Sequence, residues 1–175
     1  EAWGASGGNY ANELKSRGSI YPTEKAVLVE LAEGIRGIAG EVFSSKIQNT
    51  LDGLDLSGVS GGIREEESRF SNNNKTDFTN NIISIQNVYL GTYGNTGNGK
   101  GLSVIVAAEN AALDTKIKTQ ISEAIAAIQA IGGNADVTFS TALSSERASI
   151  EAAQLKVKTL ETTLRTELLT LISNL

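Results

Sequence analysis

The chain has 175 residues, with 20 acidic against 15 basic side chains and a formal net charge of -5. It contains neither histidine nor cysteine, which excludes disulfides, thiol chemistry, and the commonest general base and transition-metal ligand. The scattered lysines and arginines form no basic patch, so nothing indicates nucleic-acid binding. No apolar run approaches the roughly 20 residues that span a bilayer.

Residues 1–20 are predicted to form a lead-in segment that precedes a helical domain of residues 21–175. Within the lead-in segment, Tyr10 and Leu14 lie four positions apart, a spacing that can support a short helix over residues 9–17. A frayed segment without regular structure is the alternative. Gly18 follows directly and is typical of a helix end.

The first long helix is predicted to open at residues 21–24, where Pro22 has a φ angle suited to a helix start. Its apolar residues then recur every three or four positions, as on one face of a helix. Gly34, Gly37 and Gly40 interrupt it, and each costs about 1 kcal/mol against alanine in a helix interior. Their spacing favours close packing of another backbone against this side.

Glycine-rich stretches divide the middle of the chain. Residues 50–63 are expected to form a loop that lies against the domain. A second helix should begin after Thr76, a plausible N-cap, and end at Gly91. Residues 93–101 follow as a second loop rich in glycine and asparagine.

The rest of the chain is predicted to be helical as well. A short helix is expected at residues 103–108, and Asn110 is a candidate N-cap of a third long helix that stops at Gly132. A last helix, over residues 143–171, repeats its apolar residues nearly every seven positions. Four such amphipathic helices predict an all-α fold, an up-and-down four-helix bundle with one or two short extra helices.

The densest polar cluster begins with three adjacent carboxylates, Glu65, Glu66 and Glu67. Such a run can bind a hard cation through oxygen ligands, or it can be a solvated face. Arg69 can hold a carboxylate or phosphate through two parallel hydrogen bonds. It can equally fix the loop by an internal salt bridge, to Glu67 or Asp77.

The neighbouring side chains offer hydroxyl and amide groups. Ser68 and Ser71 are hydroxyl donors beside the arginine, and without a histidine base neither is expected to be a nucleophile. Phe70 is expected to be an apolar plug that anchors the loop in the core. Asn80 and Asn87 are seven positions apart on one face of the second helix, where they can form a polar wall or satisfy backbone groups.

Several strings occur in a fixed order along the chain. They are EVFSSKI at 41–47, ESRFS at 67–71, DF-x-NNI-x-x-IQNVYLG at 77–91, GKGLS at 99–103, LD-x-x-I at 113–117 and EAAQ-x-x-x-x-x-LE at 151–161. From about Tyr21 onward the chain resembles the second half of proteins of the imelysin family, which are bacterial periplasmic and surface proteins. That family's Gly-x-His-x-x-Glu motif belongs to the first half, and it cannot be present here because the chain has no histidine.

The resemblance implies an exported protein, periplasmic or anchored at the outer membrane or cell surface. Contact with a membrane would be made only through a lipid anchor outside this segment. The expected partner is the N-terminal imelysin half, as part of the same gene product or as a companion chain. ESRFS would lie near the groove between the two halves.

The expected function is that of a non-catalytic half of a binding protein that takes part in iron or metal uptake. No catalytic residue is expected in this chain. A metal ion (iron, calcium or zinc) would be held mainly by the missing half, with Glu67 as a candidate ligand. The candidate ligand-binding residues are Glu67, Ser68, Arg69, Ser71, Asn80 and Asn87.

Two alternatives stay open at this point. The chain can be a fragment of an imelysin-type metallopeptidase whose histidine and glutamate residues lie in the missing half. It can also be a structural helical bundle that binds no ligand.

Overall fold

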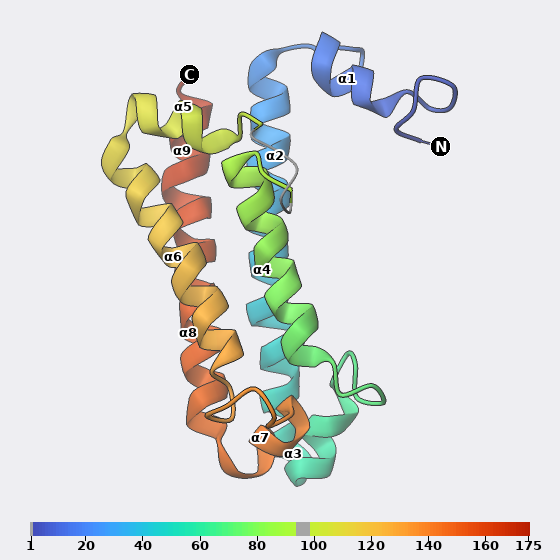
Figure 1. Ribbon diagram of the computed structural model, residues 1–175, viewed down its shortest axis with the longest axis vertical. Coiled ribbons are helices and arrows are strands. Elements are labelled where there is room, and N and C mark those ends of the chain that lie inside the picture. The colour runs from blue at the N-terminus through green and yellow to red at the C-terminus, as the bar shows by residue number, and fades with distance from the viewer. Residues whose placement is uncertain (1, 94–98) are drawn as a thin grey trace.

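Four long helical rods form a bundle in the computed structural model, which describes residues 2–93 and 99–175 (Figure 1). Within these residues all regular secondary structure is helical, and the predicted all-α bundle is confirmed. The elements are α1 (Tyr10–Ser16), α2 (Glu24–Gly40), η1 (Glu41–Ile47), α3 (Gln48–Arg64), α4 (Asn74–Leu90), α5 (Leu102–Glu109), α6 (Ala111–Gln129), α7 (Phe139–Ser145), α8 (Arg147–Thr163), η2 (Leu164–Leu168) and α9 (Leu169–Ser173). None of the described helices combines the length and the apolar character needed to cross a membrane.

The first rod starts close to its predicted position. Thr23 is the N-cap of α2, and its hydroxyl oxygen accepts the N–H of Ala26 at 3.0 Å. Pro22 therefore lies just outside the helix. The rod then continues without a break through η1, a π-helical segment, into α3.

The prediction of a loop over residues 50–63 is wrong, because these residues belong to α3. The helix bends at Ser57 and at Gly58, whose φ of +67° is left-handed. The bend brings the end of α3 back onto its beginning, and a Cβ on Gly53 would lie only 2.8 Å from the carbonyl oxygen of Gly61. These glycines allow two helical segments to touch through their backbones, which a local pattern cannot distinguish from a loop.

The backbone contact predicted at Gly34 and Gly37 is also absent from the described residues. A Cβ added at either position would meet nothing within 4 Å, and both glycines are exposed. At Gly40 the added Cβ would touch only the side chain of Glu161, at 3.9 Å.

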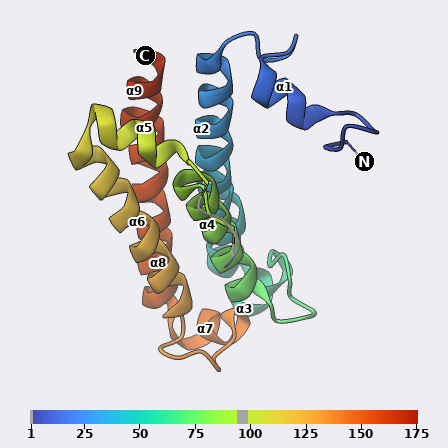
Figure 2. The same ribbon diagram turned by 45° about the horizontal axis from the view of Figure 1, so that its top comes forward.

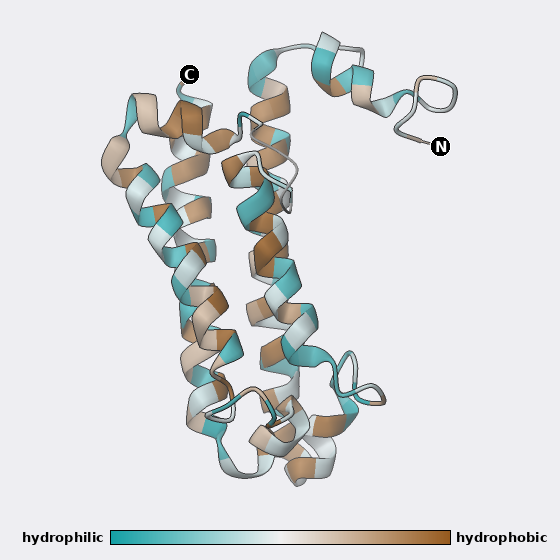
Figure 3. Ribbon diagram, in the orientation of Figure 1, coloured by the Kyte–Doolittle hydropathy of each residue, from teal (hydrophilic) through white to brown (hydrophobic). Residues whose placement is uncertain are grey.

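The core runs the whole length of the bundle. Figure 3 shows apolar positions alternating with hydrophilic ones along each long helix, as an amphipathic pattern requires. The largest fully buried side chains are Tyr89, Phe78, Phe139, Ile35, Ile47, Ile82, Ile85, Ile117, Ile121, Ile128, Ile131 and Ile150. The predicted core leucines Leu160 and Leu164 are both fully buried.

Two helix boundaries differ from the prediction. The second long helix, α4, starts at Asn74 with Asn73 as its N-cap, so Thr76 lies inside its first turn. The predicted last helix is divided, because the backbone at Glu146 leaves the helical conformation and separates α7 from α8. Leu143 therefore belongs to α7.

Other predicted boundaries are confirmed. Gly91 ends α4 with a φ of +74°, and the side chain of Asn110 caps α6 by accepting the N–H of Leu113 at 3.0 Å. The short helix expected at 103–108 is α5. The loop expected at 93–101 lies partly outside the described residues, which do not include 94–98.

The connection between α6 and α7 is organised around one ammonium group. Lys75, in the first turn of α4, donates to the carbonyl oxygens of Ile131 (2.8 Å), Asn134 (2.9 Å) and Val137 (3.0 Å). Burial lowers the pKa of Lys75, and the charge of Asp136 opposes that shift. A single side chain thus satisfies three carbonyls of a segment without regular structure.

The lead-in segment contains the helix that the sequence predicts, now bounded at Tyr10–Ser16. None of the residues of α1 is buried, and the segment leaves the bundle at the end where α2 begins (Figures 1 and 2). Its closest tie to the domain is the hydrogen bond between the hydroxyl groups of Tyr10 and Tyr21, at 2.6 Å.

Candidate functional site

The loop between α3 and α4, residues 65–73, is held by Glu66, a member of the acidic run for which the sequence left open a cation site or a solvated face. Glu66 is only 6% exposed. Its Oε2 accepts hydrogen bonds from Asn74 Nδ2 at 2.5 Å and from Ser140 Oγ at 2.7 Å. The loop is therefore tied both to the start of α4 and to α7.

A second set of hydrogen bonds fixes the middle of the loop. The N–H of Ser68 donates to Asn74 Oδ1 at 2.8 Å, and Ser68 Oγ donates to Asp77 Oδ2 at 2.5 Å. Ser71 Oγ donates to the carbonyl oxygen of Ser68 at 3.3 Å. Both hydroxyl groups of the candidate site are thus engaged within the loop and the first turn of α4.

The prediction that Phe70 plugs the core is wrong, because this side chain is 88% exposed. The guanidinium carbon of Arg69 lies 4.5 Å from the centre of its ring, a cation–π contact. Arg69 Nη1 donates to the carbonyl oxygen of Arg64 at 3.4 Å. Among the described residues it forms no ion pair with Glu67 or Asp77, so the alternative of an internal salt bridge is not seen. Hydrogen bonding by Glu66, and not apolar burial, anchors the loop.

Glu67 lies on the side of the loop that faces the first rod. Its carboxylate pairs with the ammonium of Lys46 at 3.0 Å, while Lys46 also lies 3.7 Å from Glu41. The Glu67 side chain is 46% exposed and that of Lys46 is 13% exposed. The π-helical segment η1 thus presents a largely buried cation to the acidic residue of ESRFS.

The two asparagines of the candidate site lie at different heights along α4. Asn80 is exposed, about one turn beyond Asp77, and Asn87 follows about 10 Å farther along the helix axis. The carbonyl of Asn87 accepts the N–H groups of Gly91 (2.8 Å) and Thr92 (3.0 Å) at the helix end. The structure therefore gathers Glu67, Ser68, Arg69 and Ser71 in one loop, with Asn80 nearby and Asn87 apart from them.

The residues that hold this loop had no local signal in the sequence. Burial raises the pKa of the Glu66 carboxyl, and the hydrogen bonds from Ser140 and Asn74 act against the shift. Its other oxygen, Oε1, is buried and has no hydrogen-bond partner among the described residues. Ser140 lies 74 positions away in the chain, so only the tertiary structure shows the contact.

The acidic residues do not form a complete metal centre. Among residues 2–93 and 99–175, no group of three or more Asp or Glu side chains lies close enough to hold a metal ion. Glu67, the candidate ligand, already faces the ammonium of Lys46. A metal ion would therefore need most of its ligands from outside the described part of this chain.

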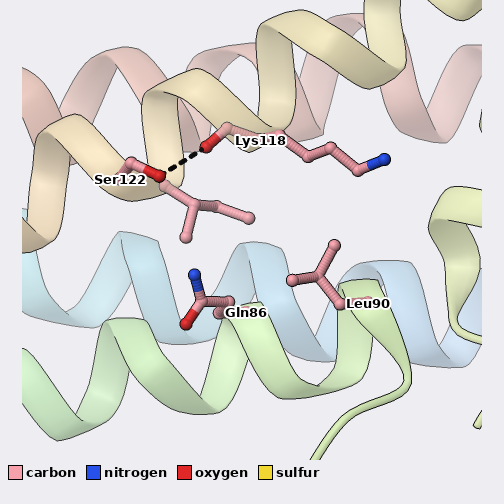
Figure 4. Close-up of a pocket in the computed structure, with 5 residues that line it drawn as sticks. Gln86, Leu90, Lys118 and Ser122 are labelled. Atoms are coloured by element: carbon pink, nitrogen blue, oxygen red, sulfur yellow. Dashed lines mark hydrogen bonds between the residues drawn. The ribbon is translucent and has the colours of Figure 1, made fainter. Parts of the chain in front are cut away.

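A separate cavity of about 340 Å³ lies between α4 and α6 (Figure 4). It is lined by Gln86, Leu90, Lys118, Ile121 and Ser122. The Lys118 ammonium is paired with Asp114 at 2.7 Å, and Ser122 Oγ donates to the Lys118 carbonyl at 3.1 Å. Its lining includes none of the residues of the 65–73 loop.

Comparisons with known proteins agree with the strings found in the sequence. The sequence model of the family described as Imelysin matches residues 1–164. No curated protein matches the chain.

Two solved structures share the fold. An imelysin peptidase of Bacteroides ovatus is 32% identical with a TM-score of 0.83, over 94% of this chain and 46% of its own. A putative iron-regulated protein A precursor of Parabacteroides distasonis is 25% identical with a TM-score of 0.77, over 90% of this chain and 45% of its own. The chain thus spans less than half the length of either protein.

Proposed function

Because the chain belongs to the imelysin family, we propose that it is the non-catalytic half of an imelysin-like binding protein that takes part in iron or metal uptake. It works in the periplasm or at the cell surface. One structural relative is named an iron-regulated protein, which supports a role in iron metabolism. The same relative is described as a precursor, which supports export. The ion or ion complex is the cargo, and the ligands that this chain lacks come from the other half.

The observation that carries the proposal is the fixed conformation of the 65–73 loop. Asn74 binds both Glu66 and the backbone of Ser68, so the segment that bears Glu67 and Arg69 is held in place before any ligand arrives. A binding site needs such preorganised support behind its contacting groups. We assign one wall of the site to Glu67, Ser68, Arg69 and Ser71, with Asn80 beside them, and leave out Asn87, which lies farther along α4.

The chemistry of that wall suits a charged, oxygen-rich cargo. Arg69 is exposed, and a guanidinium binds carboxylate or phosphate oxygens through two parallel hydrogen bonds. Glu67 supplies a carboxylate that can turn from Lys46 towards a cation. A chelated metal ion, which carries both a cation and anionic oxygens, would engage both residues.

The first test is calorimetric titration of the chain alone with Zn²⁺, Ca²⁺ and Fe²⁺. We expect no submicromolar zinc affinity, because histidine and thiolate ligands are absent. Submicromolar zinc binding by the chain alone would contradict the assignment of the main ligands to the other half.

The second test uses the chain joined to the other half of an imelysin-like protein, titrated with ferric citrate. Arg69→Ala should weaken binding at least tenfold, whereas Lys158→Ala, which removes an exposed charge on α8, should leave it unchanged. Equal affinities for the two variants would refute the assigned wall. Metal-dependent cleavage of a test peptide by the joined protein would favour the metallopeptidase alternative, and neither binding nor cleavage would favour a structural bundle.

A further inference from the structure

The turn that joins α2 to α3 is wider than an α-helix, and the apolar pattern of the sequence explains why. Val42 and Ile47 are both fully buried, five positions apart. A regular α-helix would bring position 46, four residues after Val42, onto the same face. The structure instead forms the π-helical segment η1, and the N–H of Gln48 donates to the carbonyl oxygen of Phe43, five residues earlier. The extra residue lets Ile47 take the core position and moves Lys46 to the edge of the core.

A side chain of the last rod holds this wide turn. Gln154 Nε2, on α8, donates to the carbonyl oxygen of Phe43 at 3.0 Å and to Gln48 Oε1 at 2.7 Å. From the start of α3, Thr50 Oγ1 donates to the carbonyl oxygen of Lys46 at 2.8 Å. The contacts of Gln154 join two of the strings noted in the sequence, EVFSSKI and EAAQ-x-x-x-x-x-LE. Together these bonds fix the backbone from which the Lys46 side chain leaves.

The displaced lysine reaches the acidic residue of the candidate site. The Lys46 side chain is 13% exposed, and its ammonium lies 3.0 Å from the Glu67 carboxylate and 3.7 Å from that of Glu41. The side chains of Glu67 and Glu41 are 46% and 61% exposed. The ammonium is therefore more buried than either carboxylate, so the carboxylates are the groups that are free to turn towards solvent.

We propose that Lys46 determines the specificity of the cargo site, and that Gln154 and the π-helical turn position it. An ammonium 3.0 Å from Glu67 neutralises that carboxylate and repels a bare metal cation that approaches it. An anionic chelate of a metal ion carries its own negative oxygens, and these can bind the ammonium once Glu67 turns to the metal. The inference rests on the proposed function and adds the selection of a chelated ion over a bare one.

The first experiment measures hydrogen exchange of the chain alone, without cargo. Lys46→Met keeps an apolar stem and removes the charge, so the amides of Ser68 and Ser71 should exchange about threefold faster, as for loss of a partly exposed ion pair. Gln154→Met should have a similar effect, although the hydrogen bonds of Gln154 go to the turn and not to the loop. Lys116→Met, which breaks an ion pair between α6 and η2, is the matched control and should leave both amides unchanged.

The double variant separates positioning from a general loss of stability. If Gln154 acts through Lys46, the variant with both substitutions should exchange no faster at the loop than Lys46→Met alone. Additive effects would overturn the positioning role of Gln154, and so would a lower melting temperature of Gln154→Met with unchanged exchange at the loop. Unchanged exchange in Lys46→Met would overturn the role of Lys46.

The second experiment uses the chain joined to the other half of an imelysin-like protein, titrated separately with Ca²⁺ and with ferric citrate. Lys46→Met should bind ferric citrate about tenfold more weakly, because a charge-assisted hydrogen bond is lost. It should bind Ca²⁺ more tightly, because Glu67 is no longer neutralised. Weaker binding of both, as structural damage would cause, or no change in either, would overturn the proposal. If the unsubstituted joined protein binds no ferric citrate while the chain alone shows the expected exchange, the proposed function is refuted and the positioning of Glu67 by Lys46 stands.

Discussion

The seam between α6 and α8 and the outer face of α2 are made by helices of the same bundle, yet they differ in what covers them. In the seam, Ile117, Ile121, Val157 and Leu160 are at most 1% exposed. On the outer face of α2, a Cβ added at Gly34 would meet no atom within 4 Å. The seam therefore stabilises the fold by apolar burial, whereas a methyl group added at Gly34 would meet no neighbour in the described part of the chain. Removing a buried side chain from the interior should therefore lower the free energy of unfolding, whereas adding a methyl group at Gly34 should raise it.

The largest effect is expected in the interior of the last rod. Leu164→Ala should lower the free energy of unfolding by about 2–5 kcal/mol, because the side chain is fully buried and its loss leaves a cavity. Urea denaturation followed by circular dichroism measures the change. A loss below about 1 kcal/mol would mean that the Leu164 side chain is loosely packed in the interior of the last rod.

The next effect concerns the backbone contact inside α3. Gly61→Ala should destabilise the protein by about 1–3 kcal/mol, because the added methyl group would overlap the carbonyl of Gly53 and lie 2.6 Å from Ser57 Cβ. The same urea experiment measures it. An unchanged stability would show that the two segments of α3 separate easily.

Gly34→Ala is the matched substitution on the open face. It should raise the stability of the isolated chain by about 1 kcal/mol, because alanine favours the helix and its methyl group meets no neighbour. A destabilisation would show that α2 is already covered in solution, for example by self-association, which sedimentation would detect.

The smallest effect is a pH dependence at the loop. Burial raises the pKa of Glu66 above its ordinary value of 4.5, so the native state holds this proton more tightly than the unfolded state does. Its contribution is therefore most favourable below pH 4.5 and is lost as the pH rises through the raised value. Glu66→Gln removes the titration, so the melting temperature of the wild type should fall relative to the variant between pH 4 and pH 7. If the melting temperatures of the wild type and the variant change in parallel with pH, the burial of the Glu66 carboxylate would be contradicted.

Local patterns predicted the bundle because an apolar stripe on each rod and the cap at Asn110 depend on neighbouring residues. The predictions drawn from the glycines were wrong for a physical reason. A glycine is required where backbones touch, as at Gly53 and Gly61, but it is also tolerated where nothing touches, as at Gly34. The sequence does not distinguish these two cases.

The candidate site was predicted only in part, because some of its contacts are local in the sequence and others are not. Glu67, Ser68, Arg69 and Ser71 are contiguous, so their grouping follows from the chain itself. The burial of Glu66 depends on Ser140, and the exposure of Phe70 depends on that anchor. Whether these residues bind a cargo remains a prediction for the joined protein.

Because of Lys75, the connection between α6 and α7 does not depend on a dissolved metal ion. Three carbonyl oxygens converge on its ammonium group at 2.8–3.0 Å, an arrangement in which many loops hold a dissolved calcium ion. Here the cation is covalently tethered, so its local concentration stays constant whatever the composition of the surroundings. The α6–α7 connection should therefore keep its shape in media stripped of metal by chelators, where an ion-dependent loop would open.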